Sequence, residues 1–186
     1  MKNILIVLSG PSGVGKGTIA KKLVERNPNI ALSISCTTRK SRVGEVDGKD
    51  YFFVSHQQFL DQINNNGFLE YSEHFENFYG TPRAFVETKL KQNDVLLEID
   101  VNGGLNVKRN FKDAILIMVL PPSVDEVYNR LVKRKTESEE KIKLRMKRME
   151  FELSQQNLYD YSVVNDDLMT AVKNIENIIL KEKNIN

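Results

Sequence analysis

Ser9-Gly10-Pro11-Ser12-Gly13-Val14-Gly15-Lys16-Gly17-Thr18 is the stretch that decides the fold of this 186-residue chain. The apolar run Ile4-Leu5-Ile6-Val7-Leu8 before it has the length and branching of a buried parallel strand. The apolar residues after it recur at helical spacing: Ile19, Ala20, Leu23 and Val24. A glycine-rich turn between a strand and a helix lets backbone N–H groups surround phosphates at the helix N-terminus. The stretch therefore predicts a phosphate-binding loop, to which Lys16 adds a positive charge.

One position departs from the usual phosphate-loop pattern. That pattern places Ser or Thr directly after the lysine, whereas Gly17 separates Lys16 from Thr18 here. It therefore stays open which residue supplies a hydroxyl to magnesium, and Thr18 is the candidate. A glycine-rich turn that binds no nucleotide is the alternative. The coincidence of strand, four-residue gap, Gly-Lys pair and helix favours the nucleotide-binding loop.

Composition limits what such a loop can belong to. The length suits one domain, and a formal charge of +2 leaves any phosphate binding to local clusters of Arg and Lys. Cys36 is the only cysteine, and His56 and His74 are the only histidines, so an intrachain disulfide and a cysteine-rich zinc site are excluded. No secretory signal pattern and no membrane-spanning run is found. We expect a soluble cytoplasmic protein.

Helix and strand patterns alternate along the chain, which favours an α/β fold with helices on both faces of a parallel sheet. The segments that read as strands after the first are 33–39, 51–54, 68–71, 95–100, 114–120 and 161–164. Asn165-Asp166-Asp167 predicts the cap of a closing amphipathic helix. The apolar face of that helix is expected to hold Leu168, Ala171, Val172, Ile175, Ile178 and Ile179.

Capping signals predict the ends of two helices in the middle of the chain. A capping box at 55–58 begins one helix, and Gly67 is expected to end it. Thr81 is the expected N-cap of the next helix, with Pro82 at its first position. The apolar face of the first of these helices is expected to hold Phe59, Leu60 and Ile63.

Charged side chains stand at three places that could form a site. Arg39-Lys40-Ser41-Arg42 clusters positive charge, which either binds an anion or simply solvates a surface. Glu70 lies in a strand-like segment, where it faces outward or needs a polar partner if buried. Asp100 ends a predicted strand, and ligands of parallel sheets collect at the carboxyl ends of strands. These residues are therefore candidates for ligand contacts.

Two helices with many basic side chains are predicted after Pro121-Pro122, and capping boxes at 123–126 and 136–139 begin them. Their apolar stripe is sparse and consists of Val127, Leu131, Ile142, Met146 and Met149. The basic residues that they carry include Arg130, Lys133, Arg134, Lys135 and Arg145. This pattern favours a mobile lobe, with a solvated charged hairpin as the alternative.

Taken together, these residues resemble the guanylate kinase family of nucleoside monophosphate kinases over almost the whole chain. The motifs that carry the resemblance are the loop at 10–16, Ser35-Cys36-Thr37-Thr38-Arg39 with Arg42, Gly44-Glu45, Tyr51-Phe52-Phe53, Phe68-Leu69-Glu70, Tyr79-Gly80-Thr81, Asp100, Arg130-Leu131 with Arg134, Ser138-Glu139-Glu140, Arg145-Met146 and Val164-Asn165-Asp166-Asp167.

The resemblance implies a single domain of the P-loop NTPase type over residues 1–186, a parallel sheet core flanked by helices. The core would comprise 1–34, 86–125 and 153–186. A GMP-binding lobe would be inserted at 35–85 and a lid at 126–152.

The resemblance also implies roles for individual residues. ATP would be bound by Gly10 to Thr18 and by Asn165, and the transferred phosphoryl group would be stabilised by Lys16, Arg39, Arg130, Arg134 and Arg145. The GMP phosphate would be held by Ser35, Arg39, Arg42, Tyr51 and Tyr79, because guanidinium forks and hydroxyls suit an anion with several acceptor oxygens. Guanine would be read by Glu70, Thr81 and Asp100.

The chemistry of guanine agrees with these roles. Guanine offers N–H donors at N1 and N2 and an acceptor at O6, so carboxylates and a hydroxyl complement it. Adenine would place a lone pair against a carboxylate, and a polar site left unpaired discriminates by a factor on the order of 10⁴.

The implied reaction is MgATP + GMP giving ADP + GDP, a step of purine nucleotide metabolism. The acceptor phosphate has a second pKa near about 6, so no general base is needed. Neutralising the anions is the main task, and lid closure would also exclude water. Mg²⁺ would be held mainly by the nucleotide phosphates without a dedicated protein cage, with Thr18 or Asp100 acting through water. Asp100 could therefore serve guanine, magnesium or both.

Some residues depart from the family pattern. Asn102 stands where Gln is usual, and Lys133 and Lys135 flank Arg134 where Gly is common, which leads to the hypothesis of a stiffer, more basic lid. Three alternatives stay open: a non-catalytic scaffold module of the same fold, a nucleic-acid binder using the basic helices, and a kinase for AMP or UMP. The intact loop and lid arginines speak against the first. Acids among the basic helices speak against the second, so we expect no nucleic-acid partner and no membrane partner.

Overall fold

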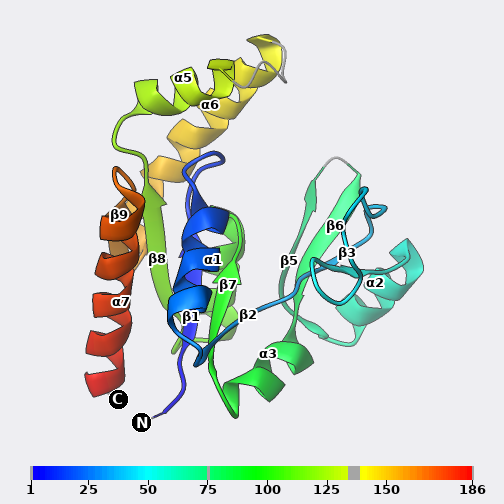
Figure 1. Cartoon of the computed structure of the whole chain (residues 1–186). Helices are drawn as coiled ribbons and strands as arrows, with labels where there is room; N and C mark the ends of the chain where they lie inside the picture. Colours follow the sequence, from blue (N-terminus) through cyan, green and yellow to red (C-terminus); the bar gives the residue numbers. More distant parts are fainter. Residues whose placement is uncertain (1, 75, 134–138, 186) are drawn as a thin grey trace.

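The structure is a computed structural model that describes residues 2–74, 76–133 and 139–185. A five-stranded parallel sheet with the strand order β2-β7-β1-β8-β9 forms its core (Figure 1). The strands are β1 (Leu5–Ser9), β2 (Ile30–Leu32), β7 (Asp94–Glu98), β8 (Ile115–Leu120) and β9 (Tyr161–Val164). The predicted α/β fold is confirmed. Strand β2 was not predicted, because three residues are too short for a periodic pattern.

Both faces of this sheet are covered by helices. Along β1, Ile6 and Leu8 face one apolar cluster, whereas Leu5 and Val7 face the other. The first cluster is completed by α1 (Lys16–Arg26) and α7 (Leu168–Ile185), and the second by α3 (Arg83–Leu90) and α4 (Val101–Asn110). Each fully buried aliphatic side chain stabilises the fold by about 1.5–3 kcal/mol. Burial on both faces explains why β1 and β8 read as continuous apolar runs.

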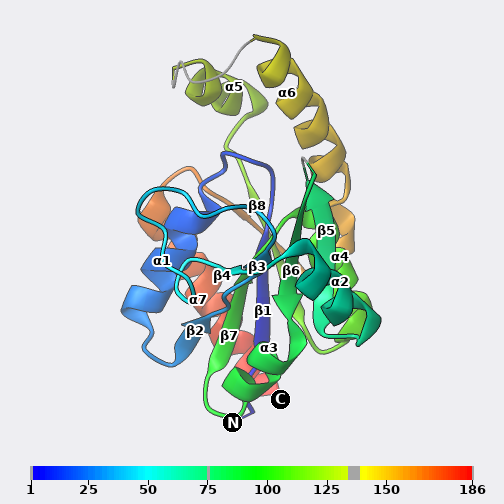
Figure 2. The same cartoon turned by 90° about the vertical axis from the view of Figure 1, so that its right-hand side faces the viewer.

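A second, four-stranded sheet lies beside the core, with the order β4-β3-β6-β5 (Figure 2). Its elements are β3 (Cys36–Thr37), β4 (Phe52–Phe53), α2 (His56–Asn64), β5 (Phe68–His74) and β6 (Asn77–Pro82). Phe59 of α2 is its buried centre, with ring centroids 4.3 Å from Phe68 and 5.3 Å from Phe78. Leu60 is 41% exposed, so its predicted place on the apolar face was wrong.

The capping box predicted for α2 is confirmed, because Ser55 and Gln58 exchange both bonds. The predicted end of the helix was wrong: α2 ends at Asn64, and the left-handed residue is Asn66 (φ 52°) instead of Gly67. The Gly67 N–H reaches back to the Gln62 carbonyl at 2.8 Å. Asn tolerates the left-handed conformation that this helix end requires, so Asn66 takes the position that was expected of Gly67.

The predicted capping role of Thr81 was also wrong. Strand β6 continues through Pro82, which is itself the N-cap of α3, and the helix begins at Arg83. Thr81 is fully buried, and its hydroxyl donates to Glu70 at 2.6 Å. A partner on the neighbouring strand has therefore displaced the local capping interaction.

Helices α5 (Val124–Lys133) and α6 (Glu139–Ser154) form an arm at the end of the molecule opposite both termini (Figures 1 and 2). The predicted N-terminal cap of α5 is confirmed, because Ser123 Oγ accepts a 3.1 Å bond from the Glu126 N–H. The predicted apolar stripe is confirmed where it is described, with Val127, Ile142 and Met149 buried together and Met146 packed beside them. Residues 136–138 of the second predicted capping box lie outside the described residues.

The chain returns to the core sheet through a short 3-10 helix, Gln156–Leu158, and β9. Asp167 caps α7, accepting a 2.8 Å bond from the Thr170 N–H. The predicted apolar face of α7 is confirmed, because Ala171, Val172, Ile175 and Ile179 are buried against the sheet. Among the described residues, no helix combines the length and the apolar composition needed to span a bilayer.

Candidate functional site

The loop between β1 and α1 has a backbone that its glycines make possible. Gly10 has φ 147°, and a Cβ there would stand 2.3 Å from the Val119 carbonyl oxygen. Gly13 and Gly15 have φ of 89° and 95°, in the left-handed region that side chains disfavour. Gly15 ends the loop, and α1 begins at Lys16, so the N–H groups of its first turn face the loop.

Lys16 lies over this loop. Its Nζ donates to the carbonyl oxygens of Gly10 at 2.7 Å and Pro11 at 3.1 Å. Burial lowers its pKa, while the charges of Glu98, Glu152 and Asp100 oppose that shift. The lysine is thus held in the loop on neutral acceptors, which phosphate oxygens can replace.

Asn165 braces the same loop from the end of β9. Its buried side chain donates from Nδ2 to the Val14 carbonyl at 2.7 Å. A Cβ at Gly15 would lie 2.6 Å from that Nδ2. The structure therefore places Asn165 in contact with the loop backbone. Thr18 lies in the first turn of α1 and is exposed.

A cavity of about 170 Å³ opens at the carboxyl end of the core sheet, between it and the second sheet. Its polar lining includes five of the residues singled out from the sequence: Ser35, Tyr51, Glu70, Tyr79 and Asp100. Two further lining residues, Ser72 and Glu98, were missed. Thr81 adjoins the cavity through its bond to Glu70.

Two acids meet at one end of this cavity, at the N-terminus of α4. Asp100 is the N-cap of α4, and its Oδ1 accepts from the Gly103 N–H at 2.7 Å. A Cβ at Gly103 would lie 3.0 Å from Glu70 Oε2 and 3.3 Å from Asp100 Oδ1. A side chain at Gly103 would crowd both carboxylates, which lie at the positive end of the helix. Groups that donate hydrogen bonds are the natural ligands of this end.

Glu70 has an unusual environment for a carboxyl group. It is only 7% exposed, and burial raises its pKa from 4.5 to about 7, with the nearby Asp100 adding to the shift. The Thr81 hydroxyl and its backbone act in the opposite direction. The group therefore titrates near neutral pH, which is typical of functional sites.

Arg39 adjoins the cavity through Tyr51, which lines it. Its guanidinium forms a two-bond contact with Glu45, at 3.0 and 2.9 Å, and lies 5.4 Å above the Tyr51 ring. Glu45 also accepts a 2.7 Å bond from the Arg42 N–H, so one carboxylate orders the whole turn. The hydrogen bond to Glu45 raises the pKa of Arg39 and lowers that of Glu45. Tyr79 packs edge-on against Tyr51, with centroids 6.2 Å apart.

Glu98 connects the cavity to the phosphate loop. It lines the cavity at the end of β7, and a Cβ at Gly17 would lie 3.4 Å from both of its carboxylate oxygens. Burial raises its pKa, and Lys16 opposes the shift. The sequence signal was present, since an acid stands at the end of an apolar strand. Asp100 was the only acid predicted to act at that strand end.

Of the basic residues predicted on the arm, only one is described with its side chain. Arg145 is half-buried on α6. Arg130 lies on α5 with its side chain outside what the structure describes, and Arg134 lies outside the described residues altogether. Arg148 was missed, yet its Nη2 lies 3.3 Å from Asp100 Oδ2. Its position one helical turn after Arg145 was the feature of the sequence that could have identified Arg148.

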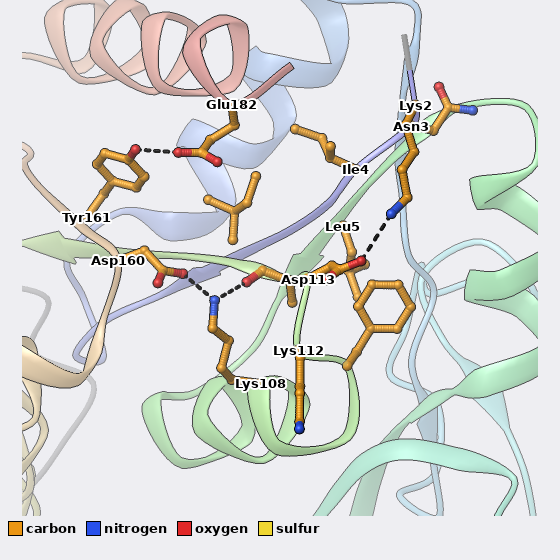
Figure 3. A pocket seen from close by; sticks show the side chains of 13 residues that line it. Lys2, Asn3, Ile4, Leu5, Lys108, Lys112, Asp113, Asp160, Tyr161 and Glu182 are labelled. Atoms are coloured by element: carbon orange, nitrogen blue, oxygen red, sulfur yellow. Dashed lines mark hydrogen bonds and ion pairs between the residues drawn. The ribbon is translucent and has the colours of Figure 1, made fainter. Parts of the chain in front are cut away.

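A second cavity, of about 450 Å³, lies at the opposite, amino-terminal edge of the sheet (Figure 3). Four of its charged side chains form two ion pairs: Lys2 with Asp113 at 3.0 Å and Lys108 with Asp160 at 2.9 Å. This cavity lies at the opposite end of the strands from the glycine loop, whereas the smaller cavity lies beside that loop.

No group of three or more His, Cys, Asp or Glu side chains is arranged to hold a metal ion within the described residues. The carboxylates whose charges act on Lys16 are those of Glu98, Glu152 and Asp100, and Thr18 offers a hydroxyl in the first turn of α1. Carboxylate and hydroxyl oxygens suit Mg²⁺, which keeps several waters and binds largely through substrate phosphates. The residues present therefore fit an ion carried by a nucleotide.

The phosphate loop and its lysine lie beside a cavity that is lined by acids and by two tyrosines, with Arg39 over the ring of Tyr51. This arrangement defines a P-loop nucleotide kinase. The model of the guanylate kinase family matches residues 2–182. A guanylate kinase of Caldanaerobacter subterraneus subsp. tengcongensis is 50% identical, over 98% of this chain and 89% of the relative. A guanylate kinase of Clostridium tetani is 49% identical, over 98% of this chain and 88% of the relative. The crystal structure of guanylate kinase from Anaplasma phagocytophilum matches with a TM-score of 0.78 and 37% identity, over 97% of this chain and 86% of that one.

The chain therefore belongs to the guanylate kinase family. The activity of this family is the transfer of the ATP γ-phosphoryl group to GMP, which gives ADP and GDP.

Proposed function

We propose that this chain performs the ATP:GMP phosphotransfer of its family at the cavity between the two sheets. ATP phosphates would bind on the loop from Gly10 to Thr18, where the N–H groups of the first turn of α1 converge. Lys16 would leave the carbonyls of Gly10 and Pro11 for the phosphates. Asn165 would act on ATP indirectly, by holding Val14 and thus the shape of the loop.

Guanine would bind at the acidic end of the cavity. Glu70 and Asp100 accept hydrogen bonds there, and guanine carries donors at N1 and N2. The bond from Thr81 leaves Glu70 Oε1 satisfied and orients the carboxyl group. Adenine has no N–H at N1, so it would leave a buried carboxylate unpaired, at a cost of about 1–3 kcal/mol or more.

The GMP phosphate would bind at the other end of the cavity, with Ser35, Tyr51 and Tyr79 as hydroxyl donors and Arg39 and Arg42 as cations. Glu45 holds Arg39 beside Tyr51 until the phosphate arrives. A planar guanidinium suits a phosphate because its fork donates two parallel bonds. The distance between the two ends of the cavity would thus select a nucleoside monophosphate.

The reaction needs charge neutralisation more than proton transfer. The acceptor phosphate has a second pKa near about 6 and is largely ionised at neutral pH. Lys16, Arg39 and the arm arginines Arg130, Arg134 and Arg145 would stabilise the equatorial oxygens of the transferred group. Water would be excluded when the arm closes, which protects ATP from hydrolysis.

Mg²⁺ is the cofactor we infer for this reaction. It supplies Lewis-acid stabilisation of phosphoryl oxygens when it is bound with ATP. Glu98 is the acid that lies closest to the loop and would orient water around the ion, with Asp100 or Thr18 as further candidates.

The chain is divided into a core, a GMP-binding lobe and a lid. The second sheet and α2 support a GMP-binding lobe over 35–85, and α5 and α6 support a lid over 126–152, with 1–34, 86–125 and 153–186 as the core. Because ATP and GMP are cytoplasmic metabolites, we place the enzyme in the cytoplasm. Nucleic acid and membranes are not among its proposed partners.

The observation that carries this assignment is the placement of Glu70, Thr81 and Asp100 at the N-terminus of α4. The experiment is a coupled assay of ADP formation with MgATP and GMP, AMP or UMP in turn. We expect a strong preference for GMP that Glu70→Gln abolishes, and loss of all activity in Lys16→Met. Glu73→Gln, on the exposed side of the same strand, is the matched control. Equal activity with AMP would refute the base assignment.

A further inference from the structure

Two residues of α6 that no sequence motif singled out lie beside Asp100, an acid of the functional cavity. Arg148 and Glu152 are one helical turn apart, and Arg148 Nε donates to Glu152 Oε1 at 3.0 Å. The Nη2 of the same guanidinium reaches Asp100 Oδ2 at 3.3 Å. Arg148 thus bridges an acid of its own helix and an acid of the core.

The two acids face different sites. Asp100 shares the N-terminus of α4 with Glu70, at the end of the cavity proposed for guanine. Glu152 is 5% exposed. The pKa of Lys16 in the phosphate loop is lowered by burial; the charge of Glu152 opposes that shift, whereas the charge of Arg148 adds to it. The Ser9 hydroxyl, at the start of the phosphate loop, donates to the Asp100 carbonyl at 3.2 Å, so Arg148 contacts a residue that adjoins both the cavity and the loop.

The electrostatics of this arrangement favour exchange of partners. A buried carboxylate such as Glu152 requires a compensating charge, which Arg148 provides. The Arg148 side chain is 45% exposed, so it can adjust its position without a large packing cost. Guanine donors on Asp100 would reduce the demand of that acid for Arg148. The positive charge would then turn toward the phosphate loop.

We propose that Arg148, held by Glu152, is the positioning residue that couples the two nucleotide sites, so that GMP on Asp100 strengthens ATP binding at Lys16. The proposal rests on the proposed function of the cavity and adds a link that runs through α6. Coupling between sites is reciprocal, so ATP must strengthen GMP binding by the same factor.

The test is isothermal titration of GMP with and without a saturating β,γ-imido analogue of MgATP. The ratio of the two dissociation constants is the coupling factor. In the unaltered protein we expect a factor of about 5 or more, in the usual range for coupled sites. In Arg148→Met it should fall close to one, and Arg148→Lys should recover part of it because a charge remains without the fork.

Lys147→Met is the matched control, since it removes a neighbouring exposed cation of the same helix. The proposal is overturned if Arg148→Met keeps the coupling factor of the unaltered protein, if Lys147→Met lowers it equally, or if the unaltered protein has a factor of one.

A cycle with Glu152→Gln gives a second measurement. The double variant Arg148→Met/Glu152→Gln should lose no more coupling than Arg148→Met alone, because both changes break one link. Additive losses would contradict a shared path. Failure of the unaltered protein to bind GMP would instead contradict the proposed function, so the two failures are distinguishable.

Discussion

The Thr81 hydroxyl donates a 2.6 Å hydrogen bond to Glu70 across two antiparallel strands, and both side chains are buried. A β-bulge between Phe68 and Glu70 shifts the register, because Phe68 pairs with Pro82 and Glu70 with Thr81. Phe68 packs in the core of the second sheet, and its neighbour Leu69 faces the core of the main sheet. Bulges re-aim side chains beside functional sites. Here the bulge accompanies an acid turned inward toward α4.

The affinity for GMP should depend on pH through Glu70. Its pKa of about 7 in the free protein means that the carboxylate, which accepts the guanine N–H groups, is lost as the pH falls below 7. We expect KM for GMP to rise below pH 7, approaching about tenfold per pH unit where Glu70 is mostly protonated. Steady-state kinetics from pH 5.5 to 8.5 measure this.

The control is the Glu70→Gln profile. It should retain only the titration of the GMP phosphate, near about pH 6. An inflection near 7 that persists in this variant would assign the titration to another group.

Glu70→Gln should stabilise the ligand-free protein at alkaline pH. The folded-state pKa of Glu70 is raised from 4.5 to about 7, so its favourable contribution is complete below about pH 4.5 and is lost as the pH rises through 7. The ionised group then destabilises the fold by an amount on the order of 3 kcal/mol. Urea unfolding at pH 8 should show the variant more stable, and the difference should shrink at pH 5. A constant difference at both values would contradict the buried-acid argument.

Thr81→Val keeps the shape of the side chain and removes its hydroxyl. Glu70 then loses its buried donor, which should cost about 1–3 kcal/mol of stability and lower GMP affinity about tenfold, with ATP affinity unchanged. Chemical unfolding and titration of each nucleotide measure these effects. Thr88→Val, on the exposed face of α3, should change neither quantity. Equal losses of ATP and GMP affinity would indicate a general structural defect.

Gly15→Ala tests the phosphate loop. The residue has φ 95°, and a Cβ would lie 2.6 Å from Asn165 Nδ2, so both strain and a clash are introduced. Gly44→Ala is the matched comparison, because Gly44 has φ 90° with nothing within 4 Å of the added atom. We expect Gly44→Ala to cost about 1 kcal/mol, and Gly15→Ala to cost more and to weaken ATP binding by tenfold or more. Equal effects in both variants would remove the role of Asn165 as a brace.

Glu98→Gln should change the magnesium requirement. The Glu98 carboxylate lies beside the first turn of α1 and close to Lys16, so its loss removes the acid best placed to orient water around the ion. We expect the Mg²⁺ concentration for half-maximal activity to rise about tenfold, in the range seen for outer-shell ligands. Asp113→Asn, at the opposite edge of the sheet, is the control. An unchanged magnesium curve would leave Asp100 or Thr18 in that role.

Several features followed from the sequence alone because their causes are local. The phosphate loop is one of them, since a β-strand, four glycines and an α-helix follow each other within 23 residues, from Ile4 to Arg26. Positive φ values at Gly10, Gly13 and Gly15 agree with that interpretation. The Ser55 capping box and the apolar stripe of α6 are further cases, because each depends on neighbours at most a few turns away.

The tertiary structure alone decided which polar side chains meet. Thr81 had the residue type of an N-cap, yet burial beside Glu70 across the strand pair gave it another partner. Arg148 and Asp100 are separated by 48 positions and meet only because α6 returns to the carboxyl end of the sheet. Local backbone geometry is determined by adjacent residues, whereas a polar side chain takes the partner that long-range packing brings within reach, because a buried polar group cannot remain unpaired.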